Sequence, residues 1–309
     1  MFCALPFELP PPLPYNGRMS DDTQPPIDAS TRLCAVFGHP INHSASPAMQ
    51  NAGIAALKLN WRYLAFDVHP DNLREAITGA ARMGFVGINL TVPHKLLALE
   101  MVDVVDDQAK PWGAVNTIVF EKHANQIRSR GFNTDADAIV KSLKEDFALE
   151  SLRGISVLLL GAGGAARTAA LRLAKEGVAA LSIINRTASR SAELAETIRK
   201  DCPNVTVTNS YPGHTVDLAL NATSLGLKPD DSAPIDMEWL RKHPPQYVYD
   251  MIYRPKETEL LHAAKRLGCR TANGASMLLH QGARSLELWT GQPAPLAEMR
   301  RALEKNIYG

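Results

Sequence analysis

Short apolar runs alternate with amphipathic segments along the chain after its first thirty residues. Three of the runs, RLCAVFG at 32–38, WRYLAFDV at 61–68 and GFVGINLTV at 84–92, are typical of buried strands. Between them, residues 48–59 and 71–83 space their apolar side chains as amphipathic helices do. The first part of the chain is therefore predicted to alternate strand and helix.

A hairpin and another helix separate this part from a second, stronger series of strands and helices. Residues 116–133 form the predicted hairpin around the turn HANQ at 123–126, and residues 135–147 form the helix. A new strand begins at Ile155. Because strands and helices alternate, we predict an α/β fold with mainly parallel sheets covered by helices. The pattern indicates two α/β domains in series.

The run ISVLLL at 155–160 leads directly into the glycine-rich turn GAGGAA at 161–166, and a helical segment follows. Gly161 permits the tight turn, Gly163 lets backbone amides approach a pyrophosphate, and Ala166 keeps the helix close to the sheet. The positive N-terminal end of that helix then faces the phosphates. The strand, the turn and the helix together predict a dinucleotide site of the Rossmann type.

The next strand, at 180–185, indicates which dinucleotide binds. A site for NAD carries an acidic residue about 20 residues after the glycine turn, where it bonds the ribose 2′-hydroxyl. This chain has Asn185, Arg186 and Thr187 there, with Arg190 close behind. Guanidinium groups pair with a 2′-phosphate, whereas a carboxylate repels it, so NADP(H) is predicted over NAD(H). The alternative is that both arginines only solvate the following helix.

Composition and charge exclude several classes of protein. The 309 residues include 33 Lys and Arg against 32 Asp and Glu, so the net charge is +1, and 45% of residues are hydrophobic. This balance argues against nucleic-acid binding and against an anionic-membrane binder, and no apolar run approaches the roughly 20 residues of a membrane span. The four isolated cysteines indicate free thiols in the reducing cytoplasm. His39 and His43 have no third candidate ligand, so no metal site is expected.

Residues 1–30 differ from the rest because they contain seven prolines. Proline fixes the backbone and removes a hydrogen-bond donor, so we expect a disordered tail here. The segment lacks the basic start and continuous apolar region of a signal peptide. Met19 is an alternative start of the protein.

Polar clusters follow the predicted strands of the first domain. They lie at 43–46, 89–95, 114–117 and 133–135. Ligands of α/β sheets gather beyond the carboxyl ends of strands, so these clusters are expected to converge on a small polyhydroxylated acid. Each cluster has a plainer interpretation: Ser44 and Ser46 as turn or cap residues, Lys95 as a solvated lysine, Asp135 as a helix cap.

These clusters and the glycine turn resemble the motifs of the shikimate dehydrogenase family. Nine motifs occur in the family's order: G-H-P-I-x-H-S-x-S-P at 38–47, N-x-T-x-P-x-K at 89–95, G-A-V-N-T at 113–117, N-T-D at 133–135, G-A-G-G-A at 161–165, N-R-T at 185–187, N-A-T-S at 221–224, D-x-x-Y-x-P at 250–255 and N-G-x-x-M-L-x-x-Q at 273–281. The resemblance implies reversible, NADPH-dependent reduction of 3-dehydroshikimate to shikimate, a step of aromatic amino-acid biosynthesis.

The resemblance also implies roles for individual residues. The catalytic pair would be Lys95 and Asp135. The substrate would be held by Ser44, Ser46, Thr91, Asn116, Asp135, Tyr253 and Gln281. The cofactor would be held by Gly161, Ala162, Gly163, Gly164, Ala165, Asn185, Arg186, Thr187, Arg190, Met251 and Gly274. A lysine ammonium can stabilise the negative charge that develops on the carbonyl oxygen and donate the proton, while the aspartate positions the lysine.

The same resemblance divides the chain into a substrate-binding and catalytic domain at 31–142, a Rossmann NADP-binding domain at 143–274 and a helical segment at 275–309. That last segment, which carries Gln281, is expected to return to the first domain and close the cleft.

Two departures from the family pattern put the substrate range in question. Ala136, Asp137 and Ala138 replace a glycine-containing segment, which adds a second carboxylate near the site, and Gln50 stands where many relatives have His. A dual quinate/shikimate dehydrogenase is therefore one alternative function. A catalytically silent NADP(H)-binding sensor is another, and a homodimer is an open alternative for the assembly.

Overall fold

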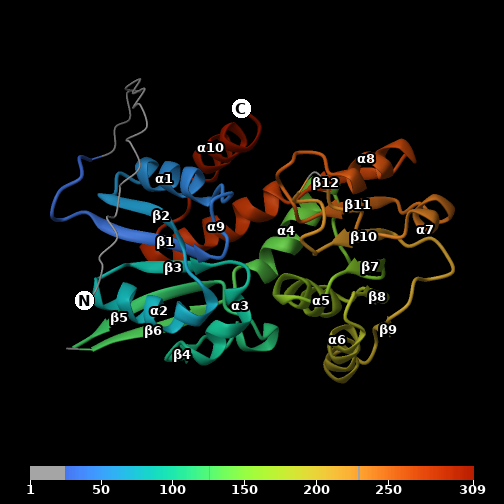
Figure 1. Cartoon of the computed structure of the whole chain (residues 1–309), viewed down its shortest axis with the longest axis horizontal. Coiled ribbons are helices and arrows are strands. Elements are labelled where there is room, and N and C mark those ends of the chain that lie inside the picture. Colours follow the sequence, from blue (N-terminus) through green and yellow to red (C-terminus); the bar gives the residue numbers. More distant parts are fainter. Residues whose placement is uncertain (1–24, 125, 229) are drawn as a thin grey trace, which may run out of the picture.

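The computed structural model describes residues 25–124, 126–228 and 230–309, and it contains two six-stranded sheets side by side (Figure 1). Most of the predicted tail, residues 1–24, lies outside the described residues. Residues 25–30 lie against the first sheet, where Asn60 Nδ2 donates to Asp28 Oδ1 at 3.0 Å and Arg62 donates to the carbonyl of Pro25.

The first sheet is mixed, with strand order β2-β1-β3-β5-β6-β4. Its strands are β1 (Arg32–Gly38), β2 (Trp61–Asp67), β3 (Gly87–Leu90), β4 (Val104–Val105), β5 (Thr117–His123) and β6 (Gln126–Phe132). Strands β1, β2 and β3 are parallel, whereas β5 and β6 form the predicted antiparallel hairpin, which also pairs antiparallel with β3. Here the helices are α1 (Ser46–Ala56), α2 (Leu73–Arg82) and α3 (His94–Leu97), with short 3₁₀ turns at Pro70–Asn72, Ala98–Glu100 and Lys110–Trp112.

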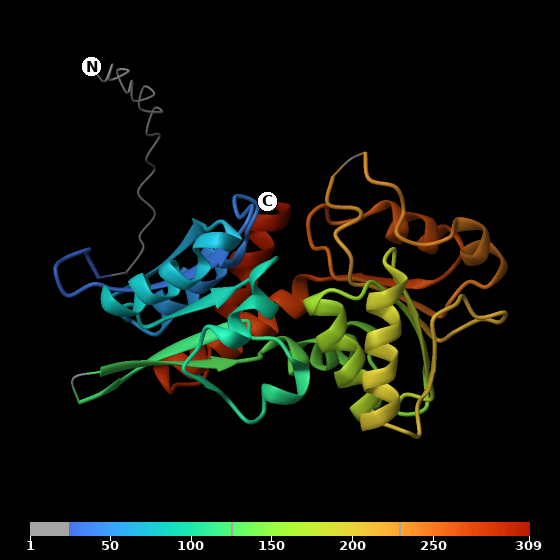
Figure 2. The ribbon, with the colours of Figure 1, turned by 60° about the horizontal axis from the view of Figure 1, so that its bottom comes forward.

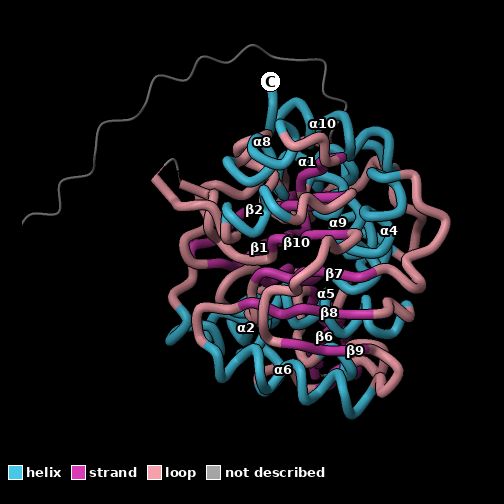
Figure 3. Tube along the Cα trace, turned by 90° about the vertical axis from the view of Figure 1, so that its right-hand side faces the viewer, coloured by secondary structure: helices cyan, strands magenta, loops and turns pink. Residues whose placement is uncertain are grey.

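The second sheet is entirely parallel, with strand order β12-β11-β10-β7-β8-β9. Figure 3 shows β10, β7, β8 and β9 as successive neighbouring strands of this sheet. The strands are β7 (Ser156–Leu160), β8 (Ala180–Ile184), β9 (Thr206–Thr208), β10 (Leu218–Asn221), β11 (Tyr247–Asp250) and β12 (Arg270–Asn273). The helices are α5 (Gly164–Glu176), α6 (Ala188–Asp201), α7 (Met237–Lys242) and α8 (Glu259–Arg266).

Alternate side chains of β7 enter two different cores, which explains why this strand is a continuous apolar run. Val157 and Leu159 pack with α4 (Asp135–Phe147), α5 and α6 on one face of the sheet. Leu158 and Leu160 pack with Trp239 of α7 and with α8 on the other face. Both faces of the parallel sheet are therefore buried, as the Rossmann-type prediction requires.

The last two helices, α9 (Ala275–Thr290) and α10 (Leu296–Tyr308), leave the second sheet and return to the first, as expected (Figures 1 and 2). Leu286 and Trp289 of α9 are buried in one core with Met49 and Ile54 of α1. The Trp289 indole nitrogen donates to the carbonyl oxygen of Ile118 at 3.1 Å. The end of the chain is thus part of the first core.

Candidate active site

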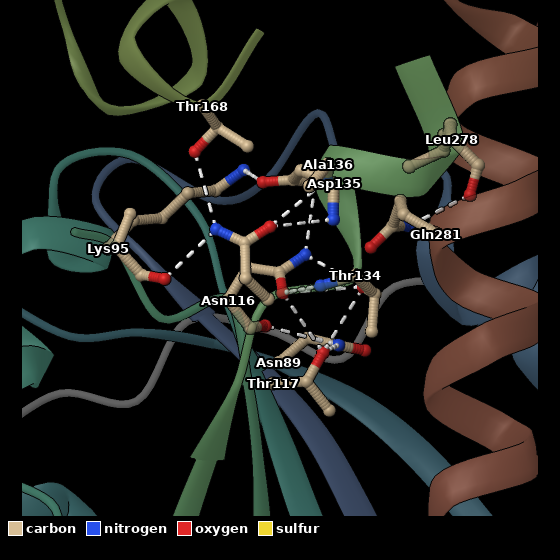
Figure 4. A network of polar contacts seen from close by, with 12 residues as sticks. Asn89, Lys95, Asn116, Thr117, Thr134, Asp135, Ala136, Thr168, Leu278 and Gln281 are labelled. Carbon is tan, nitrogen blue, oxygen red and sulfur yellow. Dashed lines mark hydrogen bonds and ion pairs between the residues drawn. The ribbon is translucent and has the colours of Figure 1, made fainter. Parts of the chain in front are cut away.

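Three of the four predicted polar clusters, those at 89–95, 114–117 and 133–135, meet where strands of the first sheet end (Figure 4). Lys95 Nζ lies 2.7 Å from Asp135 Oδ2, and the two side chains are 15% and 3% exposed. An ion pair this close and this shielded from water is a strong electrostatic contact. Residues 40 positions apart in the chain therefore form the pair that the motifs predict.

Asp135 is the first residue of α4, yet its carboxylate does not cap the helix. Asn133 Oδ1 accepts hydrogen bonds from the backbone nitrogens of Asp135 and Ala136, at 3.1 and 3.0 Å. Asn116 Nδ2 donates to the second Asp135 oxygen at 2.9 Å. Because Asn133 satisfies the helix end, both carboxylate oxygens of Asp135 are available to Lys95 and Asn116.

Asn116 is itself held on both sides of its amide. Its Oδ1 accepts from the backbone nitrogen of Thr134 at 2.7 Å, and its Nδ2 also donates to Thr134 Oγ1 at 2.9 Å. Asn116 and Thr134 are buried. The Asp135 carboxylate is therefore oriented by a fully hydrogen-bonded framework, a requirement for a catalytic group that must keep one geometry.

Lys95 lies between the two sheets, beside the glycine turn. The backbone nitrogen of Val115 donates to the carbonyl oxygen of Lys95 at 2.8 Å, which fixes the lysine backbone. A side-chain carbon placed on Gly164 would lie 3.6 Å from Lys95 Cβ. The lysine is thus adjacent to the N-terminus of α5, where a bound dinucleotide would place its phosphates.

Ser44, Ser46 and Tyr253, three of the other predicted substrate residues, lie close to one another. Ser46 is buried at the start of α1, and the backbone nitrogen of Ser46 donates to Ser44 Oγ at 3.3 Å. The Tyr253 hydroxyl, from the loop after β11, lies 3.5 Å from the backbone nitrogen of Ala45, and burial raises the pKa of this tyrosine. The second domain therefore reaches the serine turn of the first.

Thr91 and Gln281 have local contacts of their own. The Thr91 backbone oxygen accepts from the backbone nitrogen of His94 at 2.8 Å, just after the end of β3. Gln281 faces the start of α4 from helix α9, and its Nε2 donates to the carbonyl of Leu278 at 2.8 Å (Figure 4).

The glycine turn has the geometry that dinucleotide binding requires. Gly161 has a φ of +113°, and a side-chain carbon there would lie 3.0 Å from the carbonyl oxygen of Ala222. A side-chain carbon on Gly163 would meet no atom within 4 Å, so the ligand side of the turn is open. Ala162 completes the turn, and Gly164 and Ala165 are the first two residues of α5. The turn therefore fits a pyrophosphate on backbone amides.

The segment after β8 presents two cations to solvent. Arg186 and Arg190 are exposed, and neither forms an ion pair with any residue that the structure describes. Asn185 Nδ2 donates to the carbonyl oxygen of Thr187 at 2.9 Å, which shapes the turn before α6. Both guanidinium groups are therefore free to pair with a ribose 2′-phosphate.

Met251 and Gly274 meet backbone to backbone where β11 and β12 end. A side-chain carbon on Gly274 would lie 2.0 Å from the carbonyl oxygen of Met251, so only glycine fits there. The Gly274 nitrogen donates to the carbonyl oxygen of Ile252 at 3.1 Å. This contact sets the direction in which α9 leaves the second sheet.

Asp137 does not add a carboxylate to the pair, contrary to the expectation from its place in the sequence. Its side chain is 72% exposed, and Oδ1 lies 3.2 Å from Arg172 Nε of α5. It is two residues after Asp135 on a helix, and positions i and i+2 point to different sides. Its charge is therefore balanced at the surface.

Two polar residues outside the predicted catalytic and binding residues have structural roles. Asn133, which belongs to the predicted cluster at 133–135, lies just before the N-cap Thr134 and accepts from the first two backbone nitrogens of α4. Asp250 lies fully buried at the end of β11 and accepts from Asn221 Nδ2 at 2.9 Å and Thr258 Oγ1 at 2.7 Å. The sequence signal for Asp250 is a lone aspartate at the end of an apolar strand.

Within the described residues, no group of three or more His, Cys, Asp or Glu side chains could hold a metal ion. None of the helices in that part of the chain has the length and apolar character needed to cross a membrane.

Family models match three segments of the chain. Residues 36–118 match the shikimate dehydrogenase substrate binding domain, residues 143–224 match shikimate / quinate 5-dehydrogenase, and residues 274–304 match the shikimate 5'-dehydrogenase C-terminal domain.

Curated relatives match over most of their length. A shikimate dehydrogenase (NADP(+)) of Methanopyrus kandleri is 38% identical, covering 91% of this chain and 98% of the relative. A protein of the same name from Moorella thermoacetica is 43% identical, covering 91% of this chain and 95% of the relative.

Solved structures agree with these relatives. A crystal structure of shikimate dehydrogenase in complex with NADP+ has a TM-score of 0.81 at 36% identity, covering 92% of this chain and 98% of the other. The enzyme of Thermus thermophilus in complex with NADP(H) and shikimate has a TM-score of 0.76 at 34% identity, covering 89% of this chain and 99% of the other.

Proposed function

This chain belongs to the shikimate dehydrogenase family, and we propose that it catalyses the reversible NADPH-dependent reduction of 3-dehydroshikimate to shikimate. The observation that carries the proposal is the Lys95–Asp135 pair, 2.7 Å apart and adjacent to the glycine turn at Gly164. The pair places a proton donor beside the glycine turn that suits a nicotinamide dinucleotide. The reaction belongs to aromatic amino-acid biosynthesis.

Lys95 is the proton donor and acceptor of the mechanism. NADPH, when bound, supplies the hydride that reaches the carbonyl carbon of the substrate. The Lys95 ammonium stabilises the negative charge that develops on the carbonyl oxygen and gives it a proton. One carboxylate oxygen of Asp135 accepts from that ammonium and holds it in place, and the other oxygen accepts from Asn116 Nδ2. In the reverse direction, the neutral lysine takes the proton from the hydroxyl.

The substrate's carboxylate and hydroxyls are held by side chains from both domains. We assign this role to Ser44, Ser46, Thr91, Asn116, Asp135, Tyr253 and Gln281. Support comes from the position of the serine turn beside Tyr253 and from the orientation of Gln281 toward the start of α4. Hydroxyls and amides suit a polyhydroxylated acid because each can donate or accept as the ligand requires.

The cofactor would be held along the carboxyl edge of the second sheet. The residues assigned to it are Gly161, Ala162, Gly163, Gly164, Ala165, Asn185, Arg186, Thr187, Arg190, Met251 and Gly274. The open side of Gly163 suits the pyrophosphate, and the exposed guanidiniums of Arg186 and Arg190 suit the 2′-phosphate of NADP(H).

The domain boundaries are part of the same proposal: 31–142 for substrate and catalysis, 143–274 for the cofactor, and 275–309 for the returning helices. We place the enzyme in the cytoplasm, and a homodimer is the assembly to test by size-exclusion chromatography with light scattering.

The deciding experiment measures initial oxidation rates of purified protein with shikimate and quinate, each against NADP⁺ and NAD⁺. The proposal predicts a rate with shikimate and NADP⁺ that far exceeds the other three. Comparable rates with quinate or NAD⁺ would make the protein a dual quinate/shikimate dehydrogenase. Binding of NADP⁺ without turnover would make it a silent NADP(H) sensor and remove the catalytic role of Lys95 and Asp135.

A further inference from the structure

Ser285 is a buried hydroxyl of α9, one helical turn after Gln281, with no exposed surface. Its Oγ lies 2.9 Å from the carbonyl oxygen of Gln281, 2.8 Å from Asn89 Nδ2 and 2.9 Å from Thr117 Oγ1. Asn89 and Thr117 belong to β3 and β5 of the first sheet. One hydroxyl therefore joins the helix that carries Gln281 to two strands of the first sheet.

The direction of each hydrogen bond follows from counting protons. A carbonyl oxygen only accepts, so the single hydroxyl proton of Ser285 goes to Gln281. Asn89 Nδ2 only donates, so Ser285 accepts from it, and the Thr117 contact requires the proton of Thr117. Ser285 thus competes with Asn116 Oδ1 for the single proton of Thr117, and the Ser285 contact is the shorter one.

Thr117 lies next to the framework that orients Asp135. Its Oγ1 is 3.3 Å from Asn116 Oδ1 and 3.4 Å from Thr134 Oγ1, longer contacts than the 2.9 Å to Ser285. Thr117 already donates to Asn116 Oδ1, and without Ser285 its proton would be shared only between these two oxygens, which would strengthen its pull on them. Asn116 Oδ1 and Thr134 Oγ1 already accept the bonds that hold the Asn116 amide, and that amide holds Asp135.

Asn89, on the other side of Ser285 from Gln281, is also held by hydrogen bonds. Asn89 Oδ1 accepts from the Tyr63 hydroxyl at 2.7 Å, and both side chains are buried. Asn89 Nδ2 also donates to Thr117 Oγ1 at 3.0 Å. Since these groups are paired with one another, a rotation at one member forces a change at the next.

We propose that Ser285 is a positioning residue that couples the helix carrying Gln281 to the Lys95–Asp135 pair through Thr117 and Asn116. This inference rests on the proposed dehydrogenase function, because it assigns Ser285 an effect on shikimate and not on the cofactor. Ser285 contacts neither the substrate nor the reacting atoms. It fixes the position of the helix that carries Gln281 relative to the Lys95–Asp135 pair.

The test compares Ser285→Ala with Thr290→Val, a matched control. Thr290 lies on the same helix, and its hydroxyl also donates to a carbonyl one turn earlier, that of Leu286 at 2.8 Å. Ser285→Ala is expected to raise the KM for shikimate about tenfold, the equivalent of one buried hydrogen bond, and to lower kcat. The KM for NADP⁺ should change less than about twofold. Thr290→Val should change none of the three.

A second variant keeps the test valid if Ser285→Ala does not fold. Thr117→Val removes the same contact from the sheet side and leaves α9 intact. It should raise the KM for shikimate in the same way, and the double variant should cost little more than either single one, because both remove one coupled unit. Additive effects of the two substitutions would overturn the coupling.

An activity-independent measurement separates this inference from the proposed function. In protein with ¹⁵N-labelled asparagine, Ser285→Ala should shift the side-chain amide signals of both Asn89 and Asn116. A wild type that does not oxidise shikimate would reject the proposed function, while these signals would still report the coupling. Unmoved Asn116 signals, or a loss of thermal stability with both KM values unchanged, would overturn the role of Ser285.

Discussion

The side-chain oxygen of Asn133 accepts a hydrogen bond from the backbone nitrogen of Asp135 at 3.1 Å, so Asn133 and not the Asp135 carboxylate satisfies the start of the helix. Asn133 Nδ2 also donates to the carbonyl oxygen of Ala114 at 2.9 Å, which ties the helix start to the first sheet. Asp135 keeps its charge near the positive end of α4, a favourable place for a carboxylate. Because Asn133 accepts the backbone hydrogen bonds at the helix start, the Asp135 carboxylate is available to Lys95.

Substitution of Asn133 should separate the cap from the catalytic contact. Asn133→Ala removes the acceptor at the helix start and is expected to lower the free energy of unfolding by about 1 kcal/mol. Asn133→Ser, which lacks the amide donor as Ala does but keeps a side-chain oxygen as acceptor, should lose less. Urea unfolding at neutral pH measures both values, and equal losses in the two variants would contradict the capping role.

Replacement of Lys95 should abolish most turnover without loss of binding. Lys95→Met removes the proton donor and is expected to lower kcat by a factor of about 10² to 10⁴, with little change in the KM for shikimate. Lys110→Met is the control, since Lys110 is a largely exposed lysine paired with Asp107. Steady-state kinetics decide the matter, and near-normal turnover of Lys95→Met would remove this residue from the mechanism.

Arg186 and Arg190 should determine the preference for NADP⁺. Arg186→Ala combined with Arg190→Ala is expected to raise the KM for NADP⁺ by about tenfold or more, the cost of lost charged hydrogen bonds, with little effect on NAD⁺. Arg199→Ala serves as the control because Arg199 lies on the same helix as Arg190 but contacts Glu196 and Val207. If the KM values for NADP⁺ and NAD⁺ rose equally, the arginines would not be contacting a 2′-phosphate.

Asp250 should make stability dependent on pH. Burial raises its pKa from 3.8 to about 6, although hydrogen bonds from Thr258, Ile252 and Asn221 act in the opposite direction. The folded state therefore binds a proton more tightly than the unfolded state, and its stability falls as pH rises from about 4 to about 6. The whole effect is on the order of 3 kcal/mol at 1.36 kcal/mol per pKa unit.

Asp250→Asn, which stays neutral, measures this effect. The variant should gain stability relative to the wild type as pH rises from about 4 to about 6, and the difference should be constant above about pH 7. Urea unfolding at a series of pH values gives the comparison, with the exposed Asp71→Asn as control. A difference independent of pH would show that Asp250 does not titrate in this window.

Gly87 is required by the returning helix. A side-chain carbon there would lie 2.2 Å from Trp289 Nε1 and 2.3 Å from the carbonyl oxygen of Ile118, the two partners of one hydrogen bond. Gly87→Ala should lower the free energy of unfolding by about 3 kcal/mol or more through overpacking.

The matched control for Gly87 is Gly79, within helix α2. The nearest atom to a side-chain carbon at Gly79 is 4.0 Å away, so Gly79→Ala should raise stability by about 0.5 to 1 kcal/mol. Thermal or urea unfolding of the two variants compares the positions. A Gly87→Ala protein as stable as the wild type would mean that α9 does not pack as closely as described.

Features that depend on near neighbours in the chain were predictable from the amino-acid sequence. The strand at β7, the turn at Gly161 and the hairpin of β5 and β6 are each visible as a pattern within a few residues, because periodicity and turn chemistry are local. The motif order was enough to predict the family and the Lys95–Asp135 pair.

Which polar groups become hydrogen-bond partners across long distances in the chain could be seen only in the folded structure. That Asn133 caps α4, that Asp137 turns to Arg172, and that Ser285 meets Asn89 from 196 residues away depend on how the helices pack on the sheets. A serine on a helix carries no local sign of its partners. Burial without water is what forces each donor to find an acceptor, and burial is a property of the folded chain as a whole.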